Sequence, residues 1–176
     1  MTTRSGSGEA IRTALKRARN ALSRMDSVGR GTARTRATVR QGLTCDVVDG
    51  PWRFVADMPA KAGGGAEGPD PGVYGRAALA SCLAVGYTMW AAERGIDFDS
   101  LEVEVQADYD ARPEYGVGDG TPGYEAIRWV VRVQSSAPEN EVLDVLRTAE
   151  TRSPFLALFR NSQELTREIR IEAPED

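Results

Sequence analysis

The sequence predicts an α+β fold, in which antiparallel strands and helices follow one another in separate runs. Three observations indicate this fold: two segments alternate between apolar and polar residues, a turn signal joins two β-rich segments, and one long segment is helical and apolar on all sides. The predicted order along the 176 residues is one helix, three strands, a long helix, two strands, two helices and a final strand. A chain of this length is expected to form one domain with an appended arm.

The first 30 residues are predicted to form a basic helical arm, and residues 31–176 the domain. Apolar residues recur every three or four positions from about Gly8 to Ser27, as in an amphipathic helix. Up to Arg40 the chain has ten basic residues against two acidic ones, whereas the remainder has twelve against twenty-four. We therefore expect the arm to dock on the acidic body of its own or a second subunit, in preference to nucleic acid.

Residues 32–57 predict three strands. The stretch TARTRATVRQ is rich in Thr and Val, which suit a pleated strand, and TCDVVDGPWRFVAD holds an Asp49-Gly50 pair between two β-rich runs. This pair predicts a tight hairpin, because such turns need positive φ. The stretch PAKAGGGAEGPDPG then predicts a long flexible loop at residues 59–72.

The segment from about Val73 to Arg94 predicts a central helix, with Gly95 as its C-terminal cap. Apolar side chains lie all round its middle, so we expect this helix to be buried on every side. Its centre reads ALASCLAVGY and contains Cys82. A cysteine with such neighbours is most often a small buried hydrophobe, since desolvation disfavours the reactive thiolate.

The segments after this helix predict two strands, two helices and a last strand. LEVEVQADYD and YEAIRWVVRVQSS alternate as two half-buried antiparallel strands do. APENEVLDVLRTAE has the apolar spacing of a helix, and RSPFLALFRNSQEL begins a short helix with Ser153 as N-cap and Pro154 in the first turn. LTREIRIEA is expected to close the chain as a strand.

The residue types that the sequence lacks exclude several kinds of site. It contains no histidine, which removes Ser-His-Asp and Cys-His catalysis and the commonest zinc and copper ligand. We therefore expect no metal and no cofactor. The first 20 residues hold no apolar signal segment, and the longest uncharged run, Ala77–Ala92, falls short of the roughly 20 residues that span a bilayer. We expect a cytoplasmic protein without membrane contact and with free thiols.

Three stretches resemble, in this order, the OsmC and organic hydroperoxide resistance family: VDGPWRFVADMP, GPDPGVYGRAALASC and RSPFLALF. The resemblance covers about Thr32 to Ile171. It implies an OsmC-like fold, with antiparallel sheets wrapped around long central helices in an intertwined homodimer. In the peroxidase members, a helix cysteine attacks the peroxide, an arginine stabilises its thiolate, a glutamate holds the arginine, and a second cysteine resolves the sulfenic acid.

Carried onto this sequence, the resemblance implies that Cys82 is the peroxidatic thiol. The arginine is best matched by Arg40 in VRQGL, and Arg53 is a further candidate. The family thus implies a thiol-dependent organic hydroperoxide reductase, a peroxiredoxin-type enzyme of the oxidative stress response, that is regenerated by an external thiol.

Two positions depart from the family pattern. The glutamate position is Gly72, with Asp70 close by, and the resolving position is Ser153, whose place suits a helix cap. Cys45 in the first hairpin is the only other thiol, so a Cys45–Cys82 disulfide is one hypothesis for regeneration. The alternative function is a non-catalytic homodimer that binds a small hydrophobic ligand in the interfacial pocket. A third possibility is nucleic-acid binding by the arm, which would be sensitive to salt.

Overall fold

The computed structural model describes residues 5–25 and 27–172, and it follows the predicted order of elements except at the C-terminal end. The helices and strands are α1 (Ser5–Leu22), β1 (Thr35–Gln41), β2 (Thr44–Asp49), β3 (Trp52–Ala56), the 3-10 helix η1 (Ala60–Ala62), α2 (Pro71–Arg94), β4 (Ser100–Tyr109), β5 (Tyr124–Gln134), α3 (Glu139–Glu150) and α4 (Pro154–Arg160). No helix in the described ranges combines the length and the hydropathy that crossing a membrane would require.

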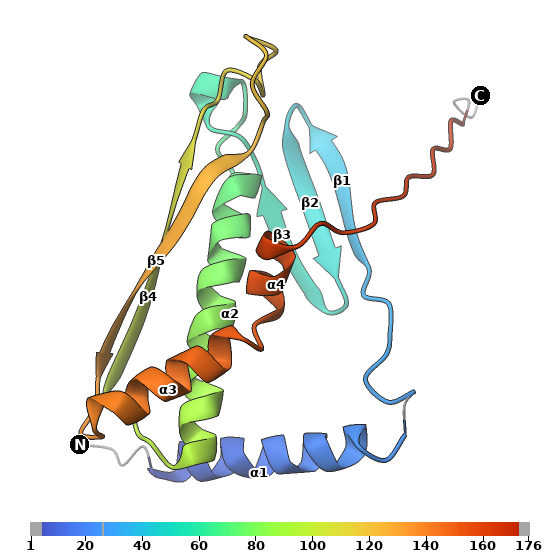
Figure 1. The fold of residues 1–176 in the computed structure, drawn as a ribbon. Coiled ribbons are helices and arrows are strands. Elements are labelled where there is room, and N and C mark those ends of the chain that lie inside the picture. The colour runs from blue at the N-terminus through green and yellow to red at the C-terminus, as the bar shows by residue number, and fades with distance from the viewer. Residues whose placement is uncertain (1–4, 26, 173–176) are drawn as a thin grey trace.

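The strands form two separate antiparallel sheets, one ordered β1-β2-β3 and the other made of β4 and β5. In Figure 1 the long helix α2 stands between these sheets. The hairpin between β2 and β3 confirms the predicted turn, since Asp49 pairs with Trp52 across the two loop residues and Gly50 has a φ of 52°. Pro51 cannot adopt positive φ, so the glycine has to supply it.

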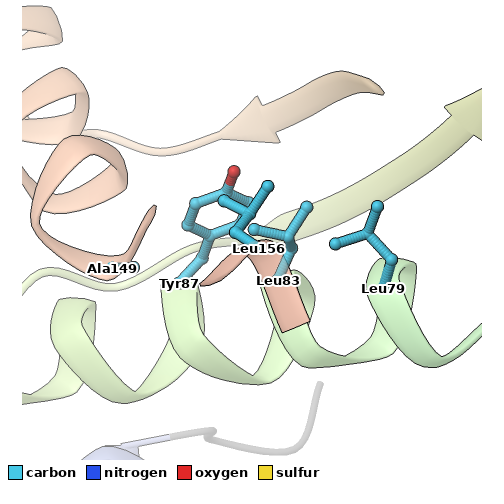
Figure 2. Close-up of a cluster of buried hydrophobic side chains, with 5 residues drawn as sticks. All are labelled: Leu79, Leu83, Tyr87, Ala149 and Leu156. Carbon is cyan, nitrogen blue, oxygen red and sulfur yellow. The ribbon is translucent and has the colours of Figure 1, made fainter. Parts of the chain in front are cut away.

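The hydrophobic core lies where α2 meets α3, α4 and the β4–β5 sheet. Leu79, Leu83 and Tyr87 are spaced four residues apart and point from one face of α2, and Ala149 and Leu156 pack over them (Figure 2). Each fully buried leucine contributes about 1.5–3 kcal/mol relative to an exposed one. This packing fixes the end of α3 and the start of α4 against the middle of α2.

The prediction that the central helix is buried on every side is wrong for the single chain. The face of α2 opposite the core remains open along Ala77, Ser81 and Val85, and the side chain of Val85 is 58% exposed. The apolar pattern of the helix shows that burial is favourable on all sides, but it does not show which sides the same chain covers.

The prediction of a final strand at LTREIRIEA is also wrong for the single chain over residues 165–172, and Ala173 lies outside the described residues. Residues 161–172 follow α4 without regular secondary structure, and Figure 1 shows this segment leading away from the body. Leu165 is 91% exposed and Ile171 is 92% exposed. A strand exists only as part of a hydrogen-bonded ladder, and within the described chain this segment lies next to no other strand.

The basic arm docks on its own chain, as expected. Helix α1 ends at Leu22, earlier than predicted, and lies across the C-terminal end of α2 (Figure 1). Arg19 forms two hydrogen bonds with the carboxylate of Glu93, one of them 2.7 Å long, and its guanidinium lies 5.0 Å from the centre of the Trp90 ring. Arg12 donates to the carbonyl of Ala92 at 2.9 Å. The arm thus uses two of its cations against the body.

Candidate active site around Cys82

Cys82 lies in the middle of α2, partly buried, with a polar neighbour from another part of the chain. Its Sγ is 3.4 Å from the Oγ of Ser153, which is itself buried at the junction of α3 and α4. The two positions that the resemblance assigned to the attacking and resolving groups therefore lie side by side. Their residues are 71 positions apart in the sequence.

Ser153 also caps α4, as the sequence predicted. Its Oγ accepts a hydrogen bond of 3.2 Å from the backbone N–H of Leu156, and Pro154 occupies the first turn. A hydroxyl has one hydrogen to donate and two lone pairs to accept with. Because the oxygen already accepts from Leu156, the hydroxyl hydrogen can point to Cys82. Ser153 can therefore donate a hydrogen bond to a thiolate while it caps the helix.

A buried tyrosine holds α3 against α2 close to this pair. The hydroxyl of Tyr87 donates to a carboxylate oxygen of Glu150 at 2.9 Å. Burial raises the pKa of Tyr87, and the hydrogen bond to Glu150 raises it further. Arg152, the residue before Ser153, lies 4.9 Å from the centre of the Trp90 ring. No sequence pattern indicated the Tyr87–Glu150 pair, although a tyrosine in the apolar middle of a helix is itself a signal that its hydroxyl needs a hydrogen-bond partner.

Arg40 makes its contacts within sheet β1–β3 and the following loop. Its Nη2 donates to Glu67 at 2.5 Å, and its Nε lies 3.7 Å from a carboxylate oxygen of Asp46. In the described part of the chain, no hydrogen bond or ion pair joins Arg40 to Cys82. A glutamate in a Gly-rich loop carries no spacing signal, so no pattern in the sequence indicated Glu67.

The two faces of the β1–β3 sheet have different chemistry. Arg36 and Arg53 both oppose Val48 and therefore share a face, and the contact with Asp46 places Arg40 there too. The sequence-predicted candidates Arg40 and Arg53 thus lie on the polar face of the sheet.

Cys45 lies on the other face of this sheet, with the apolar side chains of Val39 and Ala56 as its cross-strand neighbours. Its Sγ is 3.9 Å from the carbonyl of Leu43. Both cysteines are free, so the two thiols are not joined in this structure. Any disulfide between Cys45 and Cys82 would have to form in a different arrangement or between subunits.

Asp70 and Gly72 lie at the start of α2, where the family has its glutamate. The Oδ1 of Asp70 accepts a hydrogen bond of 3.0 Å from the N–H of Val73, so this carboxylate serves as the helix cap. The carbonyl of Gly72 accepts from the hydroxyl of Tyr124 at 3.1 Å, and the guanidinium of Arg76 donates to the same hydroxyl at 3.0 Å. Asp70 therefore caps α2 through a hydrogen bond with the helix backbone.

Two surface hollows lie elsewhere on the molecule. One, of about 550 Å³, is lined by the start of β1, the residues just before it and the β2–β3 hairpin, including Arg34, Arg36 and Gly50. The other, of about 770 Å³, lies between the ends of β4 and β5, next to Leu101 and Gln134. Neither is lined by Cys82. The ligand pocket expected from the resemblance is therefore not formed by these two hollows.

Comparison with solved structures supports the OsmC-like fold. An OsmC-like protein from Mycoplasma pneumoniae matches with a TM-score of 0.63 and 17% identity, over 74% of this chain and 88% of that one. The organic hydroperoxide resistance protein OsmC from Legionella pneumophila matches with a TM-score of 0.54 and 16% identity, over 74% and 90% of the two chains. An OsmC-like protein of unknown function from Vibrio cholerae matches with a TM-score of 0.56 and 10% identity, over 73% and 93%.

Comparison with curated proteins found no match. The family described as OsmC-like protein matches residues 63–168, a range that contains α2, the β4–β5 sheet, α3 and α4, and with them both Cys82 and Ser153. Helix α1 and the β1–β3 sheet precede the matched range. This match covers more than half of the sequence, and the chain therefore belongs to the OsmC and organic hydroperoxide resistance family.

Proposed function

We propose that this chain is an OsmC-like homodimer that reduces organic hydroperoxides with Cys82 as the attacking thiol. The observation that carries the proposal is the 3.4 Å contact between the Sγ of Cys82 and the Oγ of Ser153. In the proposed step, the thiolate attacks one peroxide oxygen and the O–O bond breaks. The other oxygen leaves as an alkoxide and takes up a proton, which gives an alcohol and a sulfenic acid on Cys82.

Ser153 supports the first step but cannot complete the cycle as a cysteine would. Its hydroxyl can donate a hydrogen bond to the thiolate, which favours the reactive form of Cys82. An alcohol does not form a disulfide with a sulfenic acid. Two equivalents of an external thiol are therefore proposed to regenerate the enzyme: the first forms a mixed disulfide and releases water, and the second releases the free thiol of Cys82.

Arg40, with Arg53 as a second candidate, is proposed to act on Cys82 across the dimer interface. In its own chain Arg40 is bound to Glu67 and Asp46, so the Cys82 that it serves would belong to the second subunit. The open face of α2 supports a dimer. Ala77, Ser81 and Val85 form a stripe of small and apolar residues against which a second helix can pack closely.

The direct test is hydroperoxide consumption with dithiothreitol or a lipoyl-type dithiol as reductant. We expect Cys82→Ser to abolish consumption and Cys45→Ser to retain most of it, since Cys45 lies on the separate β1–β3 sheet. Cys45→Ser is a matched control because it makes the same chemical change at the other free thiol. If the unaltered protein consumes no peroxide with either reductant, the enzymatic proposal is wrong.

The hypothesis of a Cys45–Cys82 disulfide is tested separately. After one equivalent of cumene hydroperoxide, proteolysis and mass spectrometry should reveal a peptide that links the two cysteines. A sulfenic acid on Cys82 with a free thiol on Cys45 would exclude this route and leave the external thiol as the regenerating group.

The alternative function is a non-catalytic dimer that binds a small hydrophobic ligand in an interfacial pocket. Two observations favour it: Gly72 stands where the family has a glutamate, and Ser153 stands where it has the second cysteine. This alternative predicts that an environment-sensitive fluorescent hydrophobic probe binds equally well to the unaltered protein and to Cys82→Ser, in the absence of any peroxide consumption.

A further inference from the structure

The ring of Trp90 in α2 binds a cation from each of two separate parts of the chain. The guanidinium of Arg19 in α1 lies 5.0 Å from the centre of the ring, and that of Arg152, between α3 and α4, lies 4.9 Å from it. A cation near an aromatic face is attracted by the negative charge of the ring. Helix α1 and the junction of α3 with α4 are therefore both attached to one side chain of α2.

One carboxylate lies beside these two cations. Glu93 accepts two hydrogen bonds from Arg19, and its pKa is lowered first by this bonding and further by the charges of Arg94 and Arg152. Arg94 is held by Asp144, whereas Arg152 forms no ion pair in the part of the chain that the structure describes. When Arg19 leaves Glu93, Arg152 is therefore the nearby cation that can replace it.

Arg152 directly precedes Ser153, whose hydroxyl oxygen lies 3.4 Å from the Sγ of Cys82. Both residues lie in a short turn. The N–H of Arg152 donates to the carbonyl of Ala149 at 3.1 Å, and the N–H of Ser153 donates to the carbonyl of Glu150 at 3.3 Å. Because the second bond is long, the position of this turn depends on the packing of its side chains as well as on its backbone.

We propose that the docked helix α1 controls the contact between Ser153 and Cys82. With α1 docked, Arg19 occupies the carboxylate, so Arg152 stays on the ring of Trp90 and the hydroxyl stays beside the thiol. When α1 is released, the carboxylate draws Arg152 off the ring, and the hydroxyl loses its contact with the thiol. Arg19 and Arg152 are thus positioning residues that touch no reacting atom.

This control adds an element from outside the family match to the site. Helix α1 precedes residues 63–168, and in Figure 1 it lies across the end of α2. Its cation Arg19 is half-exposed, and an exposed ion pair holds weakly, so the docking is readily reversible. The consequence for catalysis rests on the function proposed above for Cys82, but the contact itself affects a thiol that can be measured without peroxide.

The experiment measures the rate at which iodoacetamide alkylates Cys82 in the full-length chain. Cys45→Ser is present throughout, so that only one thiol reacts. The thiolate is the form that reacts, and a hydrogen bond from a hydroxyl favours it. We expect Arg19→Gln to slow alkylation at pH 7 by about three- to tenfold, as the loss of one hydrogen bond would. At about pH 10 the rates should be equal, because a thiol is then ionised without help.

Three further variants test the route of this effect. Arg152→Gln should slow alkylation at pH 7 as much as Arg19→Gln does. In a Ser153→Ala background, Arg19→Gln should have no further effect, since both changes remove the same contact. Arg19→Lys should restore most of the rate, because the ammonium keeps a positive charge beside the carboxylate and the ring.

The matched control is Arg17→Gln, which removes an exposed cation from the same helix and should leave the alkylation rate unchanged. Equal rates for Arg19→Gln and the unaltered cation at pH 7 would overturn the control by α1 and leave the proposed peroxide reduction standing. A change of the same size at pH 7 and at about pH 10 would also overturn it, because such a change reports access to the thiol. If alkylation responds to Arg19→Gln but the unaltered protein consumes no hydroperoxide, the proposed function alone is overturned.

Discussion

The two cysteines of this protein lie in regions that the single chain completes to different degrees. Around Cys82, α2, α3 and α4 pack closely, and Leu79 and Leu83 beside it are almost fully buried. Around Cys45, the sheet β1–β3 is open, with Trp52 72% exposed and an edge strand that nothing in the described chain covers. One chain therefore builds the pair of Cys82 and Ser153 by itself, whereas the sheet that carries Cys45 stays largely uncovered in the described chain.

The largest expected effect comes from restoring a second thiol beside Cys82. Ser153→Cys places sulfur where the oxygen now lies, 3.4 Å from the Sγ of Cys82, and a disulfide needs an S–S distance of about 2.05 Å. After one equivalent of hydroperoxide, the sulfenic acid on Cys82 should condense with the new thiol, releasing water. We expect nearly complete conversion to the disulfide, measured as the loss of two hydrogens in the intact mass and the loss of both thiols to labelling.

Ser81→Cys is the matched control for this variant. Ser81 is the next residue to Cys82 in α2, but its hydroxyl is directed to the carbonyl of Ala78. It should give no disulfide with Cys82. Equal disulfide formation in both variants would mean that the pairing of Cys82 with Ser153 is not what brings the sulfurs together.

The second prediction compares the stability of the two regions. Leu83→Ala creates a cavity in the core and should lower the free energy of unfolding by about 2–5 kcal/mol. Leu43→Ala, at the turn between β1 and β2 where the side chain is 46% exposed, should change it by no more than about 0.5–1 kcal/mol. Urea unfolding of both variants measures the difference. Similar losses would show that the hairpin region is as tightly packed as the core.

The sequence predicted the region around Cys82 more completely than the region around Cys45. The apolar helix, its Gly95 cap and the N-cap at Ser153 are local signals, and the structure has all three. That Ser153 meets Cys82 depends on how α3 and α4 fold back over α2, which no local pattern encodes. Only the family resemblance placed those two positions together.

The errors in the prediction have a common physical origin. The burial of α2 on all sides and the final strand both require contacts that the single described chain does not provide. Hydrophobic patterning reports that a surface favours burial, but it does not report whether the covering group belongs to the same chain. The same limit applies to Arg40, whose proposed contact with Cys82 lies between subunits.

The loop between the two regions is more ordered than its composition predicted. The carboxylate of Asp57 is 1% exposed and accepts four hydrogen bonds, from the hydroxyl of Thr44 and from the backbone N–H groups of Met58, Gly65 and Glu67. A Cβ at Gly64 would lie 1.9 Å from the carbonyl oxygen of Met58, so the glycines permit this close approach.

The third prediction uses the charge of Asp57. The hydrogen bond from the backbone N–H of Glu67, with those from Met58, Thr44 and Gly65, lowers the pKa of Asp57. Because folding lowers this pKa, the charged carboxylate stabilises the fold at pH values above the ordinary carboxyl pKa. This stabilisation is lost as the pH falls through the lowered pKa. Asp57→Asn should therefore clearly lower the midpoint temperature of thermal unfolding at pH 7.

The difference between Asp57→Asn and the unaltered protein should shrink as the pH is lowered below about 4. Asp46→Asn, which changes an exposed acid on β2, is the control and should have a small effect throughout. A difference for Asp57→Asn that stays constant from pH 7 to acid would contradict the role of the charge and leave only a role in packing.

The smallest expected effect concerns the docked arm. The hydrogen bonds from Arg19 lower the pKa of Glu93, which shows that the pair favours the charged carboxylate. Glu93→Gln removes the charge, keeps every trypsin site in α1, and leaves the guanidinium of Arg19 near the ring of Trp90. Because an exposed ion pair contributes little, we expect tryptic cleavage within α1 to accelerate only roughly two- to fivefold.

The exposed Glu141→Gln on α3 is the control and should leave the cleavage rate unchanged. Equal rates in all three proteins would show that α1 is held by its apolar stripe and not by charge. A faster rate in Glu93→Gln alone would show that the carboxylate of α2 fixes the arm, and added salt should then accelerate cleavage of the unaltered protein as well.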